Sequence, residues 1–214
     1  MLDSQVGENI PNLDSFLQHC QRKEYNAKRL ILKQGELSDS LYLILAGSVS
    51  VMVQDESDPD HMMVVSYLNP GDFVGELGLF EAEPQVRSAM VLARTPCAVA
   101  EITYERFNQV RSQFPEIVYA ISRQLGHRLR QTTNKLSDLA FVDVSGRIAR
   151  TLLDLCQEPD AMTHPDGMQI RVTRQELSKI VGCSREMAGR ALKSLEQGGL
   201  VEVSGKTMVV HGAR

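Results

Sequence analysis

Residues 173–195 read TRQELSKIVGCSREMAGRALKSL, and this stretch predicts two short helices joined by a tight turn. Thr173 followed by Glu176 is a capping box, which starts the first helix directly after the threonine. Gly182 permits the turn, and Ser184 is a favourable N-cap for the second helix. Two helices joined in this way form a helix-turn-helix, the motif that places its second helix in the major groove of DNA.

The second helix separates an apolar face from a polar one at about 100° per residue. The apolar residues are Met187, Ala188, Ala191, Leu192 and Leu195. The opposite face holds Arg185, Glu186, Gly189, Arg190 and Lys193. Arginine can pair with guanine through two hydrogen bonds, and glutamate accepts from the amino group of cytosine, so this face suits base recognition. An ordinary amphipathic helix with solvated charges is the alternative interpretation.

The segment after this helix predicts a β-hairpin. Gly198-Gly199 ends the helical pattern, and the β-rich runs 201–203 and 208–210 flank Ser204-Gly205. The C-terminal region is therefore expected to be a winged helix-turn-helix.

The net charge of −4 is distributed unevenly along the chain. Residues 171–193 hold six Lys or Arg against two Glu, whereas residues 138–214 as a whole are neutral, and residues 1–137 carry 13 basic and 17 acidic side chains. The basic surface is therefore local, and the acidic remainder should repel DNA.

Composition bounds the class of protein. A chain of 214 residues with 43% hydrophobic content is long enough for two domains with separate cores. It shows no long apolar run and no N-terminal signal pattern, so we expect a cytoplasmic protein with no membrane partner. The four cysteines are far apart and the five histidines are scattered, which predicts no metal site. No catalytic constellation stands out either, and we expect a protein that is not an enzyme.

Residues 28–103 alternate short β-rich runs with Gly or Pro turns, as in a β-barrel or jelly roll. The expected strands are Leu30–Leu32, Leu41–Leu45, Val49–Val53, Met62–Leu68 and Ala89–Ile102. A short helix within Leu13–Cys20 is expected to pack on the outside.

From Pro115 onward the pattern changes to a long helix. Its apolar seam, spaced by three and four, contains Ile117, Ile121, Leu125, Leu129, Thr132, Leu136 and Leu139. About 24 residues make a rod of ~36 Å, which is longer than a small domain needs, so a homodimer through this helix is expected. The alternative is a helix that lies on its own barrel.

After the long helix, Asp143 is expected to be the N-cap of a further helix. The expected division of the chain is 1–114, 115–140 and 141–214.

A candidate ligand site lies in the stretch FVGELGLF, residues 73–80, where two glycines interrupt the strand pattern. Backbone amides released by glycine at the start of a helical turn bind anions, and the Arg87-Ser88 pair could complete a phosphate site. A carboxylate at Glu76 is useful there if it accepts from a sugar hydroxyl while Arg87 offsets its charge. A Gly-rich turn with a surface ion pair is the alternative.

Taken together, several motifs resemble the bacterial cyclic-AMP receptor protein (catabolite activator protein) family of transcription regulators. They are GELGLF with the downstream RS pair, the long helix with Thr132-Thr133, DLAF at 138–141, PDAMTHPDG at 159–167 and SREMAGR at 184–190. The resemblance runs from about residue 13 to the C-terminus. It implies an α+β fold with a cyclic-nucleotide-binding jelly roll, a dimerisation helix and a winged helix-turn-helix, acting as an allosteric, cyclic-AMP-responsive activator on palindromic DNA.

The resemblance also implies roles for individual residues. Gly75 and Glu76 would engage the cyclic phosphate and ribose, Arg87 and Ser88 would hold the phosphate, and Thr132 and Thr133 of the two subunits would reach the adenine. The full set of expected ligand-binding residues is Val51, Ser66, Gly75, Glu76, Leu77, Arg87, Ser88, Thr132 and Thr133.

For DNA, the family pattern separates residues that read base edges from residues that position the backbone. Arg185, Glu186 and Arg190 would read bases, whereas Arg174, Gln175 and Ser184 would contact phosphates. The expected DNA-binding residues are Arg174, Gln175, Ser184, Arg185, Glu186, Arg190 and Lys193. In the family, the exposed turn at residues 164–167 touches RNA polymerase.

Two alternatives for function stay open at this point. The same fold could respond to cyclic GMP, cyclic di-GMP, haem or redox state; the presence of Glu76, Arg87 and Ser88 favours cyclic AMP over cyclic di-GMP, and the lack of a cysteine cluster argues against an iron–sulfur sensor. Alternatively, the chain could be a cyclic-nucleotide-binding module whose winged helix contacts protein partners. A mobility shift on a palindromic duplex distinguishes a DNA-binding regulator from this second alternative.

Overall fold

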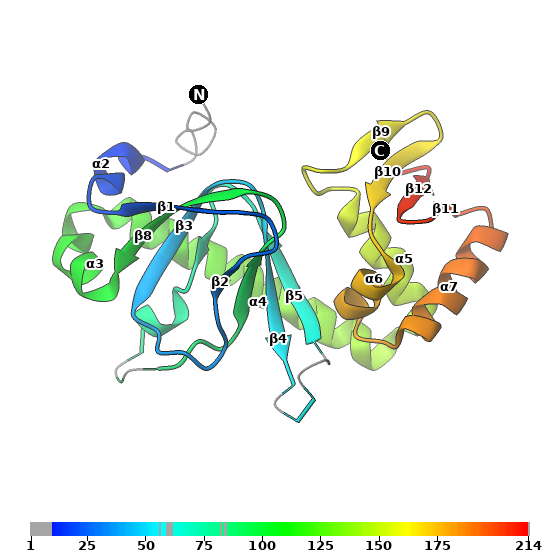
Figure 1. Ribbon diagram of the computed structural model, residues 1–214, viewed down its shortest axis with the longest axis horizontal. Helices are drawn as coiled ribbons and strands as arrows, with labels where there is room; N and C mark the ends of the chain where they lie inside the picture. The colour runs from blue at the N-terminus through cyan, green and yellow to red at the C-terminus, as the bar shows by residue number, and fades with distance from the viewer. Residues whose placement is uncertain (1–9, 56, 59–61, 82, 84, 214) are drawn as a thin grey trace. The chain divides into compact units, whose positions relative to one another are not determined.

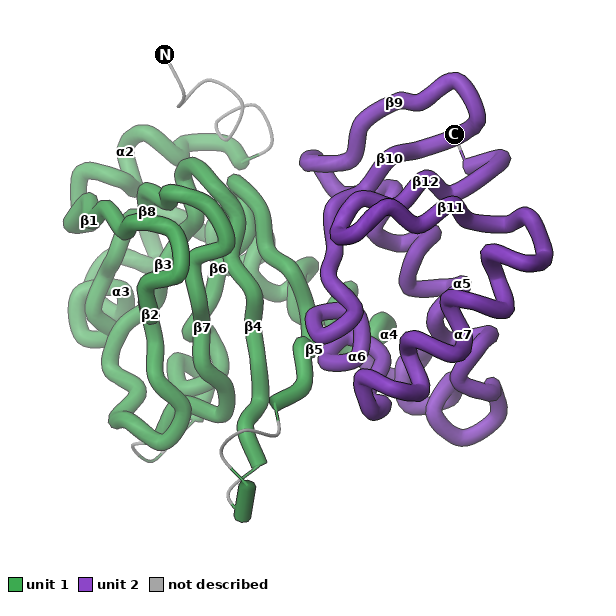
Figure 2. The backbone as a smooth tube through the Cα atoms, turned by 45° about the vertical axis from the view of Figure 1, so that its right-hand side comes forward, with its two compact units in different colours: residues 1–131 green, residues 132–214 purple. Residues whose placement is uncertain are grey.

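The computed structural model describes residues 10–55, 57–58, 62–81, 83 and 85–213. It divides into two compact units, residues 1–131 and 132–214, drawn in green and purple in Figure 2. No helix within these described residues is both long and apolar enough to cross a membrane.

The N-terminal unit consists of two four-stranded antiparallel sheets (Figure 1). The first has the order β1 (Gln21–Tyr25), β8 (Cys97–Thr103), β3 (Ser40–Ala46) and β6 (Phe73–Val74). The second has the order β2 (Leu30–Leu32), β7 (Met90–Ala93), β4 (Val49–Gln54) and β5 (Met62–Leu68). Neighbouring strands are often distant in sequence, which is the crossover pattern of a jelly roll, as the sequence predicts.

The β region departs from prediction in two respects. The run expected as one strand at 89–102 is two strands, because Pro96 lies between them and cannot donate a ladder hydrogen bond. In addition, β1 and β6 were not expected. The first of these carries mostly polar, exposed side chains and pairs along its whole length with β8, so its strand conformation depends on a partner remote in sequence.

Helices close one core of this unit. They are α2 (Leu13–Leu17), α3 (Tyr104–Val110), the 3-10 turns η1 (Leu77–Leu79) and η2 (Arg111–Gln113), and the start of α4 (Pro115–Phe141). Phe16 meets Phe107 and Phe114 edge-on, with ring centroids 6.1 and 5.6 Å apart. Ile117 and Ile121 of α4 are fully buried in the same core.

The apolar seam of α4 therefore changes its environment along the helix. Its first two turns pack inside the N-terminal unit, as the alternative interpretation of the long helix requires. Beyond Leu125, Leu129 is 69% exposed and Leu136 is 67% exposed, and Leu139 is exposed too. The later leucines of the seam are therefore largely exposed among the described residues.

The C-terminal unit contains α5 (Val144–Leu155), α6 (Arg174–Val181) and α7 (Arg185–Gln197). Its antiparallel sheet has the order β11 (Val201–Ser204), β12 (Thr207–His211), β10 (Gly167–Arg171) and β9 (Met162–His164). The β11–β12 hairpin is the predicted wing. The β9–β10 hairpin was predicted only as a turn, and β10 pairs with β12, so the wing is part of a four-stranded sheet.

The helix boundaries follow the predicted caps. The hydroxyl of Thr173 accepts from the amide of Glu176 at 3.1 Å, and that of Ser184 accepts from the amide of Met187 at 3.2 Å. The carboxylate of Asp143 caps α5. Gly182 ends α6 with φ of 71°, the left-handed conformation that favours glycine.

Candidate functional site

The Arg87 guanidinium is the centre of the candidate ligand site. The residue is only 6% exposed. Its Nη2 donates to the carbonyl oxygen of Ser40 at 2.8 Å, and its Nη1 donates to the carbonyl oxygen of Gly75 at 3.2 Å. The carboxylate of Asp39 lies 3.6 Å away. Because main-chain carbonyls from two segments fix its direction, this buried cation is preorganised for an anion.

The turn between β6 and η1 lies directly against this guanidinium. Gly75 has φ of 82°, and a Cβ atom at this position would lie 2.5 Å from Nη1 of Arg87. Only glycine therefore satisfies both the backbone conformation and the close approach. The structure brings together the predicted glycine turn and the predicted arginine, which are twelve residues apart.

Glu76 is buried, with 5% exposure, and its carboxylate accepts a hydrogen bond of 2.7 Å from Nη1 of Arg128. We expected Arg87 to offset this charge, and the structure corrects that expectation. Arg128 is better placed because α4 carries it past the turn, where its Nη2 also donates to the carbonyl oxygen of Phe73 at 2.5 Å. A buried carboxylate needs such a cation and its hydrogen bonds.

Sequence reasoning missed Arg128 and its neighbour Gln124. The Gln124 side chain accepts from the amide of Phe73 and donates to the carbonyl oxygen of Gly71, each at 2.8 Å. These two polar residues are four apart on a helix, so they share a face beside the buried seam. The four-residue spacing of two polar side chains beside an apolar seam is the sequence signal that could have identified them as site residues.

The other predicted ligand residues vary in position. Val51 of β4 and Ser66 of β5 are register partners, and both are half-buried. Leu77 begins η1 and is exposed, as is Ser88. Thr132 and Thr133 are exposed residues of α4 that belong to the C-terminal unit.

The second candidate site is the face of α7. Arg185, Glu186, Arg190 and Lys193 are exposed, whereas Ala188, Ala191 and Leu192 are buried. Met187, expected on the packed face, is 37% exposed. Side chains on a helix lean towards its N-terminus, so a residue in the first turn points past the packed surface.

Residues predicted to position the DNA backbone lie at helix N-termini. Arg174 and Gln175 are exposed in the first turn of α6, and Ser184 is the N-cap of α7. Amides at a helix N-terminus and a nearby arginine together favour a phosphate.

The pKa of the Cys183 thiol, in the turn between these helices, is raised by burial.

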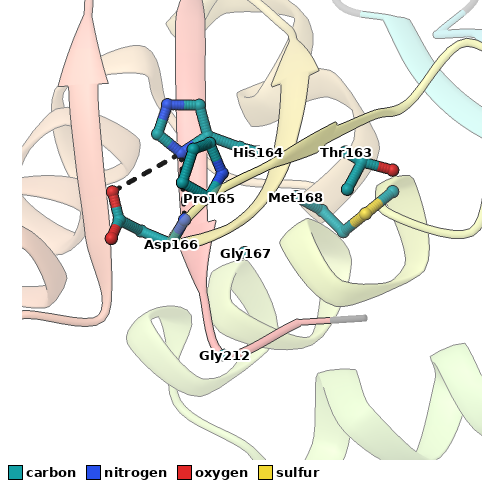
Figure 3. Close-up of a pocket in the computed structure, with 7 residues that line it drawn as sticks. All are labelled: Thr163, His164, Pro165, Asp166, Gly167, Met168 and Gly212. Carbon is teal, nitrogen blue, oxygen red and sulfur yellow. Dashed lines mark hydrogen bonds and ion pairs between the residues drawn. The ribbon is translucent and has the colours of Figure 1, made fainter.

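The turn joining β9 and β10 borders an open hollow of about 540 Å³ (Figure 3). Its lining residues are Thr163, His164, Pro165, Asp166, Gly167, Met168 and Gly212. His164 Nδ1 accepts from the amide of Asp166 at 3.3 Å and lies 3.6 Å from its carboxylate. The hydrogen bond from the Asp166 amide stabilises this turn.

Among the residues that the structure describes, no three His, Cys, Asp or Glu side chains gather into a possible metal site. All four cysteines are free thiols.

Comparison with known proteins identifies both units. The family model described as cyclic nucleotide-binding domain matches residues 22–114, and the model described as Crp-like helix-turn-helix domain matches residues 146–212. The cAMP-activated global transcriptional regulator Vfr of Pseudomonas aeruginosa is 56% identical over 207 residues, or 96% of each chain. The cAMP-activated global transcriptional regulator CRP of Salmonella typhimurium is 53% identical over 204 residues, covering 95% of this chain and 96% of CRP.

A solved structure agrees with this assignment. The c-di-GMP responsive global regulator CLP of Xanthomonas campestris superposes with a TM-score of 0.87 at 45% identity, covering 94% of this chain and 98% of CLP. With identity above one half over almost the full length, and with the glycine turn, the buried arginine and the exposed recognition helix in place, this chain belongs to the CRP and Vfr family of cAMP-activated global transcriptional regulators.

Proposed function

We propose that this protein is a cytoplasmic, homodimeric transcription regulator that binds cyclic AMP in its N-terminal unit and a palindromic operator through α6 and α7. The observation that supports the ligand most directly is the buried Arg87 guanidinium, held against the Gly75 turn beside the Glu76–Arg128 pair. Such a site offers a cation for a phosphodiester and a carboxylate for a sugar hydroxyl, which are the two features that a cyclic nucleotide presents side by side.

In this proposal each predicted ligand residue has a chemical role. Arg87 and Ser88 donate to the cyclic phosphate, Glu76 accepts from the ribose 2′-hydroxyl, and the backbone of Gly75 approaches the phosphate closely. The remaining residues would surround the base and sugar: Val51, Ser66, Leu77, Thr132 and Thr133. Thr132 and Thr133 would act from the dimer helices.

Cyclic di-GMP is a second candidate ligand, because CLP, at 45% identity, is described as responsive to it. The presence of Glu76, Arg87 and Ser88 together favours cyclic AMP, since this set matches one phosphate and one ribose. The relatives described as cAMP-activated are also more similar, at 53% and 56% identity.

The dimer is proposed to form through the later turns of α4, where Leu129, Leu136 and Leu139 are exposed. Burial of apolar side chains is the main source of stability in such a helix pair. In functional terms, residues 1–114 would bind the ligand, 115–140 would join the subunits and form the hinge, and 141–214 would bind DNA.

Each subunit would place its α7 in one half-site, with the half-sites about one helical turn apart, ~34 Å. Arg185, Glu186 and Arg190 would read base edges, whereas Arg174, Gln175, Ser184 and Lys193 would hold the backbone. Ligand bound between the subunits would favour the arrangement in which both recognition helices reach the major groove. The β9–β10 turn at residues 164–167 is the surface we propose for RNA polymerase.

Calorimetric titration with cyclic AMP, cyclic GMP and cyclic di-GMP tests the ligand. We expect cyclic AMP to bind most tightly and Arg87→Leu to weaken it roughly 10- to 150-fold, the loss expected for a charge-assisted hydrogen bond. Arg29→Leu, which removes an exposed arginine of the same unit, is the control. Binding of cyclic AMP by Arg87→Leu within twofold of the parent would show that the pocket is assigned wrongly.

A further inference from the structure

The side chain of Tyr104 lies at the meeting point of three segments of the N-terminal unit. Tyr104 is the first residue of α3, and its backbone amide donates to the carbonyl oxygen of Asp39 at 2.8 Å. Its phenolic oxygen lies 2.7 Å from the hydroxyl of Ser38 and 3.2 Å from Nη1 of Arg87, and it also bonds the carbonyl oxygen of Gly75. One atom thus links the segment before β3, the glycine turn and the buried arginine.

Chemistry determines the direction of these three hydrogen bonds. A guanidinium can only donate and a carbonyl oxygen can only accept, so Tyr104 accepts from Arg87 and donates its single proton to Gly75. The Ser38 hydroxyl must then be the donor in the third bond. The phenolic oxygen uses its one proton and both lone pairs, which is the full capacity of a tyrosine hydroxyl.

Both glycines of the GELG turn pack against this cluster. A Cβ atom at Gly75 would lie 2.5 Å from Nη1 of Arg87, and one at Gly78 would lie 2.7 Å from Oγ of Ser38 and 3.0 Å from Oη of Tyr104. The two ends of the turn therefore contact the Ser38–Tyr104–Arg87 cluster closely enough to exclude any larger residue. The position of the turn is set by these contacts.

Tyr42 is a second tyrosine whose ring contacts Arg87, and its hydroxyl makes none of the bonds made by Tyr104. The Arg87 guanidinium carbon lies 5.9 Å from the ring centroids of both Tyr42 and Tyr104. The Tyr42 hydroxyl, however, donates to the Glu101 carboxylate at 2.5 Å. Glu101 is not part of the glycine turn. The two tyrosines make similar ring contacts with Arg87 and differ in what their hydroxyls bind.

We propose that Tyr104 is a positioning residue of the phosphate site, whose hydroxyl fixes the Arg87 guanidinium and the Gly75 carbonyl relative to each other. This inference rests on the proposed binding of a cyclic nucleotide. Because the bonds of Nη1 to Tyr104 and Gly75 fix the plane of the guanidinium, they determine which exocyclic phosphate oxygen its other donors reach. Tyr104 therefore controls selectivity at the phosphate, while the nucleoside part of the ligand is bound by other residues.

The test compares Tyr104→Phe with Tyr42→Phe, each of which removes one hydroxyl and keeps the ring. Affinities are measured for cyclic AMP, for the two diastereomers of its phosphorothioate, and for adenosine by competition. We expect Tyr104→Phe to weaken cyclic AMP about tenfold and to reduce the difference in affinity between the two diastereomers, with adenosine unchanged. Tyr42→Phe should bind all four within twofold of the parent. Ser38→Ala, which removes a donor to the same oxygen, should act like Tyr104→Phe with about two- to fivefold weaker binding.

The outcomes separate this inference from the proposed function. If Arg87→Leu loses cyclic AMP but Tyr104→Phe and Ser38→Ala bind it as the parent does, the positioning role is wrong and the pocket stands. If the Tyr104→Phe protein loses cyclic AMP and adenosine equally, with the diastereomer preference unchanged, the role is merely structural and the inference is overturned. If Arg87→Leu itself keeps cyclic AMP, the pocket assignment fails first.

Discussion

Arg128 and Glu76 form a hydrogen-bonded ion pair of 2.7 Å that joins α4 to the ligand turn, across 52 residues of sequence. The next residue on the helix, Leu129, is exposed. One turn of α4 therefore contacts Glu76, which we propose to bind ribose. The same turn presents Leu129, which we propose to contact a second subunit. Ligand binding at Glu76 would act directly on the helix that we propose as the dimer interface.

The Arg128–Glu76 pair should contribute to the stability of the N-terminal unit. Arg128→Leu removes the guanidinium partner of a buried carboxylate, which should lower the free energy of unfolding by about 1–3 kcal/mol in urea titrations. Adding Glu76→Gln removes the uncompensated charge and should restore much of the loss. A double variant less stable than Arg128→Leu would contradict this account of the pair.

The exposed part of the α4 seam should control subunit association. Leu129→Lys places like charges near each other on paired helices and should produce monomers in sedimentation at micromolar concentration. Tyr119→Lys is the matched control, because it adds the same charge at an exposed position near the start of the same helix. An intact Leu129→Lys dimer would show that the seam is not the interface.

Glu186 and Arg174 should differ in how their loss affects DNA binding. Glu186→Ala should cost about 1–3 kcal/mol, mainly at one base pair of each half-site, because it removes a base contact. Arg174→Ala should weaken all sequences nearly equally and reduce the salt dependence by about one phosphate contact per subunit. Binding of both variants to singly substituted operators at two salt concentrations checks this. A uniform loss for Glu186→Ala, or changed sequence preference for Arg174→Ala, would reverse the assignment.

Cys20 should be unreactive in the folded protein. Burial raises the pKa of its thiol from 9.0 to about 12. Because the folded pKa is the higher, the stability linked to this proton is present in full below pH 9 and is lost as the pH rises from 9 towards 12. At pH 8 the thiolate fraction falls by about 10³, so iodoacetamide should label Cys20 far more slowly in the folded chain than in urea, as peptide mass spectrometry measures. Equal labelling rates in both would contradict the burial of this thiol.

Local features of the fold could be predicted from sequence because their causes are local. The caps at Thr173, Ser184 and Asp143 each depend on an amide three residues away, and the structure confirms all three. The β9 and β10 strands have no such local cause. They are short, and β10 is held between β9 and β12, so its pairing depends on a strand about forty residues further along the chain.

The candidate ligand site divides in the same way. Gly75, Glu76 and Arg87 could be found because glycine in a β region and an Arg-Ser pair are local anomalies. Arg128 reaches Glu76 across 52 residues and Tyr104 reaches Gly75 across 29, and no periodic pattern brings such pairs together. Their partners are determined by the packing of α3 and α4.

The burial of Ile117, Ala120 and Ile121 has a practical consequence for dissecting the protein. The cyclic nucleotide-binding model ends at residue 114, before these side chains enter the core. A recombinant fragment cut at that point would expose the aromatic cluster around Phe16 and would be prone to aggregate. A soluble N-terminal fragment must extend at least through Arg128, so the first three residues of the apolar seam, Ile117, Ile121 and Leu125, cannot be separated from the ligand-binding unit by truncation.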